Sequence, residues 1–359
     1  MTIALALALA SASAGEENTL KVGEVTGVWV TRWSFENPSE IETILDDCKR
    51  AGATHVFFQV RGRFDAFYES EIEPWAEELS GTLGKDPGWD PLELAVAGAH
   101  RRGMELHPWL NTYTMWSDAN APTSVGVPHA LAAHPEWTSR DSAGRQVAKG
   151  DKYVFASPGH PAVQAHISAV VDDIGRRYDV DGIHLDYLRF PGKDFDHNPA
   201  ALTAWVEQGD RATWQRGQIQ VLVRDIQAKV DVPVSAAVWG VHEDTWDWGK
   251  VTEGYGTYYQ DARAMLGDGT LDAAAPMIYW SVKDPPGSRL DFAALAVDHV
   301  AAKGAGQIWT GIAAHTLTWE QIEACLRAAR TAGADGVLFF EYKSLRDKGY
   351  IDKLEALNR

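Results

Sequence analysis

From residue 26 onward the chain alternates short apolar segments, typical of strands, with longer amphipathic segments, typical of helices. The strand-like segments are 26–33, 55–61, 105–112, 182–190, 233–240, 273–280, 307–314 and 336–342. The helix-like segments are 39–51, 91–102, 161–178, 205–230, 258–266, 291–303, 318–332 and 349–357. Eight strand–helix repeats in one chain of 359 residues predict an α/β protein with a (β/α)8 TIM barrel.

The chain shows no division into separate units. An open doubly wound sheet would also alternate strands and helices, but no glycine-rich phosphate loop follows any strand. No low-complexity linker interrupts the pattern, so we expect a single domain over 26–359. Three long connections follow strands, at 62–88, 113–160 and 191–203. In a TIM barrel such loops lie on the catalytic face.

The first residues of the chain resemble a secretion signal. Residues 1–14 are small and apolar and end in Ala12-Ser13-Ala14, the A-x-A pattern of a signal-peptide cleavage site. We therefore expect an exported protein, periplasmic or extracellular, whose mature chain begins near Gly15. No later segment has the ~18 consecutive apolar residues of a membrane span. The net charge of −17 argues against nucleic acid as a partner.

Segment 182–190 places polar groups on a buried strand. Side chains alternate along a strand, so His184 and Asp186 should share the face opposite Ile183. Such residues cost stability on a buried face. Asp186 at the C-terminal end of the fourth strand is therefore our candidate nucleophile or charge stabiliser, kept ionised by the charge of Arg61 or Arg189. The alternative is a structural aspartate that pairs with Arg189.

Other strand ends also carry candidate substrate-binding residues. They are Arg61 and Asp65 after the second strand, His107, Trp109 and Asn111 on the third, His184 and Arg189 on the fourth, Trp239 on the fifth, and Tyr279 and Trp280 on the sixth. Polar groups would position a sugar, and indole faces would stack on its ring. Two alternatives remain open: Arg61 could lock its loop through Asp65, and His107, His184 and Asp186 could bind a metal.

Carboxyl pairs and aromatic platforms are typical of glycoside hydrolysis. The second carboxyl group is either Glu341, which follows Phe339 and Phe340 on the eighth strand, or Glu243 in the loop after the fifth. Apolar surroundings favour the protonated form that an acid needs, so the sequence favours Glu341. No G-x-S-x-G elbow indicates a serine nucleophile. We expect no metal and no other cofactor.

Short motifs spread over most of 26–342 carry a family resemblance. They are GVWVT (27–31), FQVRG (58–62), DAFY (65–68), WDPL (89–92), HPWLN (107–111), HPEW (134–137), DGIHLDYLRFP (181–191) and PMIYW (276–280). As a set they resemble the glycosyl-hydrolase-like ten family of bacterial exported barrels. The resemblance implies an (α/β)8 barrel that hydrolyses a polysaccharide or oligosaccharide such as bacterial cell-wall glycan.

The fourth strand also resembles those of two other hydrolase groups. It is similar to the Gly-x-Arg-x-Asp strand of the alpha-amylase superfamily, with Asp186 in the nucleophile place and His184 in the Arg place. It looks like the chitinase Asp-Gly-x-Asp-x-Asp-x-Glu strand, but Leu188 replaces the acid, which argues against chitinase chemistry. We predict an exported glycoside hydrolase. The alternatives are a catalytically inactive carbohydrate-binding barrel and a metal-dependent hydrolase.

Overall fold

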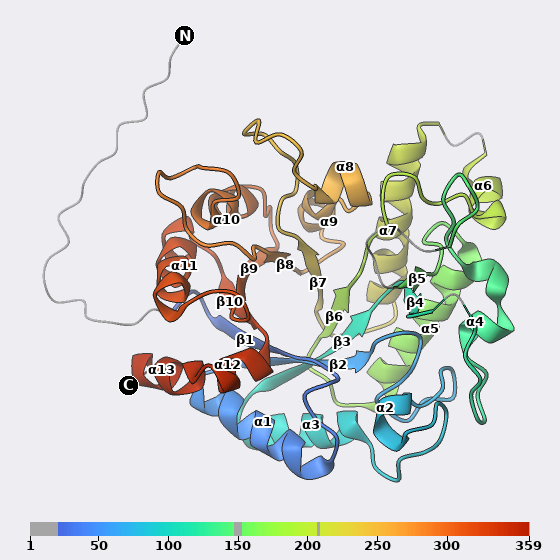
Figure 1. Ribbon diagram of the computed structural model, residues 1–359, viewed down its shortest axis with the longest axis horizontal. Coiled ribbons are helices and arrows are strands. Elements are labelled where there is room, and N and C mark those ends of the chain that lie inside the picture. The colour runs from blue at the N-terminus through green and yellow to red at the C-terminus, as the bar shows by residue number, and fades with distance from the viewer. Residues whose placement is uncertain (1–20, 119, 147–152, 207–208, 359) are drawn as a thin grey trace, which may run out of the picture.

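The computed structural model describes residues 21–118, 120–146, 153–206 and 209–358, and parallel strands in these ranges close into a barrel (Figure 1). The strands are β1 Val25–Val30, β2 His55–Arg61, β3 Glu105–Asn111, β6 Ile183–Asp186, β7 Val234–Trp239, β8 Ala273–Met277, β9 Gln307–Ala313 and β10 Gly336–Phe340. Their order around the barrel is β1-β10-β9-β8-β7-β6-β3-β2. The predicted (β/α)8 barrel is confirmed.

Helices surround the barrel (Figure 1). They are α1 Pro38–Arg50, α3 Pro91–Arg101, α5 Pro161–Arg177, α6 Pro199–Trp205, α7 Arg211–Gln227, α8 Gly254–Tyr258, α9 Ala262–Gly267, α10 Phe292–Ala301, α11 Trp319–Ala332, α12 Tyr342–Asp347 and α13 Tyr350–Leu357. Local sequence starts several of them: Asn37 and Asp90 precede Pro38 and Pro91, and both side chains accept hydrogen bonds from the first turn.

The long connections contain secondary structure of their own, and 191–203 includes most of α6. Segment 62–88 carries α2 Glu77–Ser80. Segment 113–160 carries β4 Thr114–Trp116, α4 Ala130–Ala133, the 3₁₀ helix η1 Pro135–Trp137 and β5 Val154–Phe155. β4 and β5 form a two-stranded antiparallel sheet beside the barrel. Both segments follow the C-terminal ends of barrel strands, as the sequence predicts.

Several predicted element ends are wrong. Strand β6 ends at Asp186, four residues early, because Tyr187 turns the chain with a φ of 49°. Strand β10 ends at Phe340, since the Glu341 side chain caps α12, a helix that sequence patterning missed. The helix expected over 205–230 is α7, which begins at Arg211, and α6 lies almost entirely in the connection 191–203, where no helix was expected.

Large rings from one side of the barrel meet small side chains from the other. Trp29, Phe57, Trp109 and Trp309 point inward from β1, β2, β3 and β9, and β7 and β8 contribute alanines such as Ala237, Ala273 and Ala275. The barrel interior is therefore a packed core rather than a channel.

No helix within the described ranges is long and apolar enough to cross a membrane. The expected signal segment, 1–14, lies outside the described residues.

Candidate active site

A pocket of about 370 Å³ opens at the C-terminal end of the barrel strands. Its polar lining comes from Thr31, Arg32, Gln59, Asn111, Asp186 and Arg189. Its aromatic lining comes from Trp29, Trp33, Trp109, Tyr153, Tyr187, Trp239, Tyr279, Trp280 and Phe340. Among the described lining residues, Asp186 is the only one with a carboxyl side chain.

Asp186 is held at the end of β6, 8% exposed. Its Oδ1 atom accepts a hydrogen bond from the backbone N–H of Tyr187 at 2.6 Å, and Arg189 Nη1 lies 3.6 Å from the same oxygen. Tyr187 has a left-handed backbone, which is uncommon for a residue with a side chain and is typical of strained functional sites. The turn therefore fixes the carboxylate at the pocket.

Burial and polar neighbours shift the pKa of Asp186 in opposite directions. Burial raises its pKa above the ordinary aspartate value, and the charge of Arg189 and the Tyr187 N–H partly offset that rise. The indole Nε1 of Trp109 makes no hydrogen bond within the described ranges, yet it lies close enough to the carboxylate to favour the ionised form. Burial is the larger influence on the pKa of Asp186, and the charge of Arg189 favours the ionised form, as the sequence analysis expected of it.

A hydrogen-bond chain holds the pocket floor. Trp29 Nε1 donates to His184 Nε2 at 3.0 Å, and His184 Nδ1 lies 2.9 Å from Ser235 Oγ. Burial lowers the pKa of His184 well below its usual value, so the imidazole is neutral. With Nε2 accepting, Nδ1 carries the proton and donates to Ser235. His184 therefore orients Trp29 from beneath the pocket and does not line it.

An amide pair supports the pocket wall on the β2–β3 side. Gln59 Nε2 donates to Asn111 Oδ1 at 3.1 Å, and Asn111 Nδ2 donates to the Gly62 carbonyl at 3.2 Å. Gln59 Oε1 accepts the backbone N–H of Arg32 at 3.1 Å. These bonds lock both amides, so they shape the wall and leave little freedom for movement.

Aromatic rings form the remaining walls and the rim. Trp33 is 53% exposed, and the Arg32 guanidinium lies 3.9 Å above its ring. The ring centroids of Trp239 and Tyr258 lie 4.7 Å apart. The Trp239 Nε1 atom donates a hydrogen bond to the Thr252 carbonyl at 2.7 Å. Burial raises the pKa of Tyr279 well above its usual value, and the nearby Asp186 charge adds to the effect. Tyr279 therefore presents a neutral hydroxyl beside Asp186.

The structure brings seven of the predicted site residues together. Those that line the pocket are Trp109, Asn111, Asp186, Arg189, Trp239, Tyr279 and Trp280. They come from β3, β6, β7 and the segments that follow β6 and β8. The strand-end rule therefore finds the place of the pocket and seven of its lining residues.

Arg61 and Asp65 lie outside the pocket lining. A register shift between Gln59 and Arg61 turns Arg61 away from the barrel mouth, and its Nη2 lies 2.7 Å from Glu73 Oε1. Asp65 accepts the backbone N–H groups of Gly62 and Arg63 in its own loop. Arg61 thus locks its loop, but through Glu73 rather than Asp65.

His107 is also away from the pocket. It lies near the start of β3, where its Nε2 is 3.4 Å from Glu105 Oε2. Both nitrogens of His184 are engaged by Trp29 and Ser235. The metal site considered for His107, His184 and Asp186 is therefore not assembled.

The two candidate proton donors lie outside the pocket lining as well. Glu341 caps α12, where its carboxylate accepts the backbone N–H groups of Lys343 and Ser344 at 3.0 Å and the Ser344 hydroxyl at 2.5 Å. Glu243 is exposed in the segment that follows β7. β7 pairs with β6, the strand of Asp186.

Sequence reasoning missed several lining residues. Arg32 and Trp33 directly follow β1, so the strand-end rule used for other strands would have found them. Tyr153 comes from the long 113–160 segment, and no sequence signal distinguished it from its neighbours. Trp29 lies in the middle of an apolar strand, so the sequence did not distinguish it from core residues.

Known proteins share both the sequence pattern and the fold. The family model described as glycosyl hydrolase-like 10 matches residues 24–324. The chain is 29% identical over 263 residues to glycosyl hydrolase YngK of Bacillus subtilis strain 168, covering 69% of this chain and 50% of that protein. It is 32% identical over 250 residues to glycosyl hydrolase DigH of Escherichia coli strain K12, and the match covers 66% of this chain and 56% of that protein. The chain thus spans about half the length of these curated relatives.

Solved structures share the barrel. The glycoside hydrolase domain of PgaB (BpsB) from Bordetella bronchiseptica matches with a TM-score of 0.67 at 15% identity, covering 93% of this chain and 98% of that one. The catalytic domain of beta-amylase from Paenibacillus polymyxa matches with a TM-score of 0.61 at 11% identity, covering 91% and 95%. These similarities establish the fold, and the family match establishes membership: the chain belongs to the glycosyl hydrolase-like 10 family.

Proposed function

We propose that the protein is an exported glycoside hydrolase that cleaves a polysaccharide, such as bacterial cell-wall glycan. The observation that carries the proposal is Asp186, a buried carboxyl group that lines an aromatic pocket on the C-terminal face of the barrel. Aromatic faces bind sugar rings, and a buried carboxylate stabilises the positive charge that develops at the anomeric carbon. The family and the relatives named as glycosyl hydrolases support the same reaction class.

In the proposed mechanism Asp186 acts in its ionised form, as nucleophile or as charge stabiliser. The pocket is lined mostly by aromatic rings, so the attraction between the carboxylate and an oxocarbenium-like sugar is stronger there than in water. Arg189 favours the ionised form. The Tyr279 hydroxyl is neutral and can donate a hydrogen bond to the carboxylate or to a sugar oxygen.

For the proton donor, the contacts now favour Glu243 over Glu341. The Glu341 carboxylate is held by α12, which an acid would have to release to reach a leaving group. Glu243 is exposed and follows the strand next to Asp186. We therefore propose Glu243 as the acid, contributed by the segment after β7.

Substrates with different leaving groups test this assignment. Glu243→Gln should lose about 10²–10⁴-fold in kcat/KM on glycan, the range that acid catalysis supplies, and retain most activity on aryl glycosides with good leaving groups. Glu341→Gln is the matched variant. If Glu341→Gln shows the leaving-group dependence and Glu243→Gln does not, the assignment is reversed.

The pH profile should report on Asp186. Its raised pKa means that the carboxylate is lost at a higher pH than for an ordinary aspartate, so activity should fall on the acid side from that higher value. In Arg189→Gln the offsetting charge is gone, and the acidic limb of kcat/KM should move to higher pH. Arg176→Gln, on the outer surface of α5, is the control and should leave the limb unchanged. A limb that stays in place or moves to lower pH in Arg189→Gln would contradict the role of Asp186.

One observation favours a second candidate, a barrel that binds carbohydrate without cleaving it. The described pocket lining holds a single carboxyl side chain, and glycoside hydrolysis ordinarily uses two. A panel of polysaccharides that includes purified peptidoglycan glycan strands, with mass spectrometry of the products, distinguishes the two. Binding with no products from any glycan would favour the non-catalytic barrel.

A further inference from the structure

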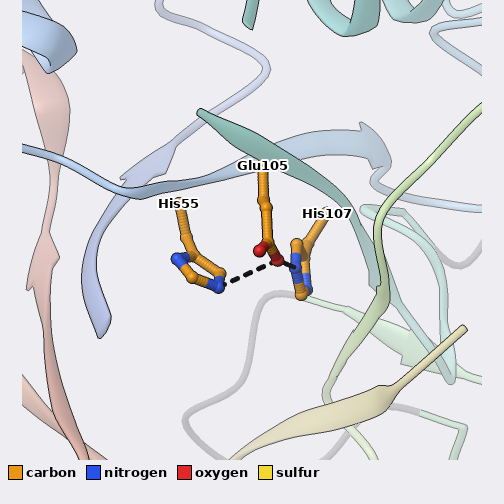
Figure 2. A group of neighbouring side chains, drawn as sticks. All are labelled: His55, Glu105 and His107. Atoms are coloured by element: carbon orange, nitrogen blue, oxygen red, sulfur yellow. Dashed lines mark hydrogen bonds and ion pairs between the residues drawn. The ribbon is translucent and has the colours of Figure 1, made fainter. Parts of the chain in front are cut away.

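A second group of potential ligands lies at the end of the barrel opposite the pocket. His55 is the first residue of β2, and Glu105 is the first residue of β3, where the two are paired across the strands. His107 follows two residues later on the same face of β3. One ligand atom from each of these side chains lies within 4.8 Å of the others, and Figure 2 shows the three converging.

The distances within this group match those around a small cation. Glu105 Oε2 lies 3.0 Å from His55 Nε2 and 3.4 Å from His107 Nε2. A tetrahedral ion with bonds of about 2.0–2.1 Å would separate its ligand atoms by about 3.3 Å. The ligand set would therefore need only small side-chain shifts to take up the ion.

A neighbouring hydroxyl orients His55, and a glycine leaves room for His107. Thr54 Oγ1 lies 2.8 Å from His55 Nδ1 and also accepts the backbone N–H of Thr26, so His55 turns its Nε2 toward Glu105. Such a partner on the far ring nitrogen is the usual support for a metal-binding histidine. The His107 ring lies over Gly182, where an added Cβ would meet His107 Cε1 at 2.3 Å. Gly182 therefore provides the space that the ring occupies.

The donor atoms decide the class of ion. Two imidazole nitrogens and one carboxylate oxygen suit zinc and similar first-row ions, whereas magnesium and calcium prefer oxygen ligands. The Glu105 side chain is 52% exposed, which gives an ion access from solvent and leaves room for water as a fourth ligand. We propose that His55, Glu105 and His107 bind a Zn²⁺ ion that joins the starts of β2 and β3.

The position of the group indicates a structural role for the ion. The N-terminal ends of the strands in a TIM barrel serve stability, and catalysis is at the other end. Asp186 lies at the C-terminal end of β6, so the ion would take no part in the reaction proposed above. The two proposals can therefore fail independently.

The test uses the full chain, untagged and stripped with EDTA, titrated with Zn²⁺ by isothermal calorimetry and followed by Tm. We expect one Zn²⁺ per chain and a rise in Tm on binding. His55→Gln and Glu105→Gln should each weaken binding at least about tenfold and reduce the Tm rise. His134→Gln removes a histidine that lies 3.2 Å from Glu136 on the surface, and it should bind as the wild type does.

Three results would overturn the proposal: less than one Zn²⁺ per chain at saturation, wild-type binding in both ligand variants, or equal weakening in His134→Gln. Circular dichroism checks that each variant is folded. If Glu105→Gln does not fold, His55→Gln alone carries the test, since His55 lies at the edge of the group.

Discussion

Asp186→Asn should lower kcat/KM at least about 10³-fold, which corresponds to about 4 kcal/mol of transition-state stabilisation. The amide keeps the shape of the side chain but removes the negative charge that the developing positive charge requires. It can also still accept the Tyr187 N–H, so the turn after β6 should persist. Steady-state kinetics on the most active glycan of the panel measures the effect.

A control separates loss of charge from loss of fold. Asp210→Asn makes the same chemical change at the N-cap of α7, where Asn serves as well as Asp, and it should leave activity and Tm unchanged. Near-normal turnover in a folded Asp186→Asn protein would remove Asp186 from the mechanism.

The second large effect is on stability. Glu73→Gln should lower the free energy of unfolding by about 3–5 kcal/mol, because it leaves the buried charge of Arg61 without its partner. Burial disfavours ionised Glu73, but the charge of Arg61 and the hydrogen bond from His166 outweigh it and lower the pKa of Glu73 to about 2. Both partners are almost completely buried, at 0% and 1% exposure. Urea denaturation measures the change.

A double-mutant cycle tests the same pair. Arg61→Met and Glu73→Leu should each destabilise the protein, whereas the double variant that carries both should recover much of the loss, since no buried charge remains unpaired. A loss below about 1 kcal/mol in Glu73→Gln would show that the pair does not hold the loop. A double variant whose loss in free energy of unfolding equals the sum of the two single losses would show the same.

The barrel could be predicted from the sequence because its signals are local. Alternation of apolar strands with capped helices repeats eight times, and each repeat can be recognised on its own. Local signals also place Asp186, Trp109 and Asn111, because the strand itself determines the position of a residue at its end. Their register, Trp109 with His184 and Asn111 with Asp186, follows from adjacent parallel strands.

The failures depend on non-local geometry. Arg61 was expected to bind substrate at the pocket, but one register shift in β2 redirects it to Glu73, which a strict two-residue period cannot reveal. Glu341 was expected on a strand, but the chain turns there into a short helix. His107 is a different failure: the predicted strand 105–112 already places it near the N-terminal end, where the strand-end rule does not put a pocket residue.

The central claim is that this barrel hydrolyses glycosidic bonds with Asp186 as its catalytic carboxylate. The most direct measurement is product mass spectrometry of a glycan digest run in ¹⁸O-labelled water. Hydrolysis places one labelled oxygen at each new reducing end, so the wild type should release labelled fragments and Asp186→Asn should release almost none. Fragments without label, or equal release of labelled fragments by Asp186→Asn, would contradict the claim.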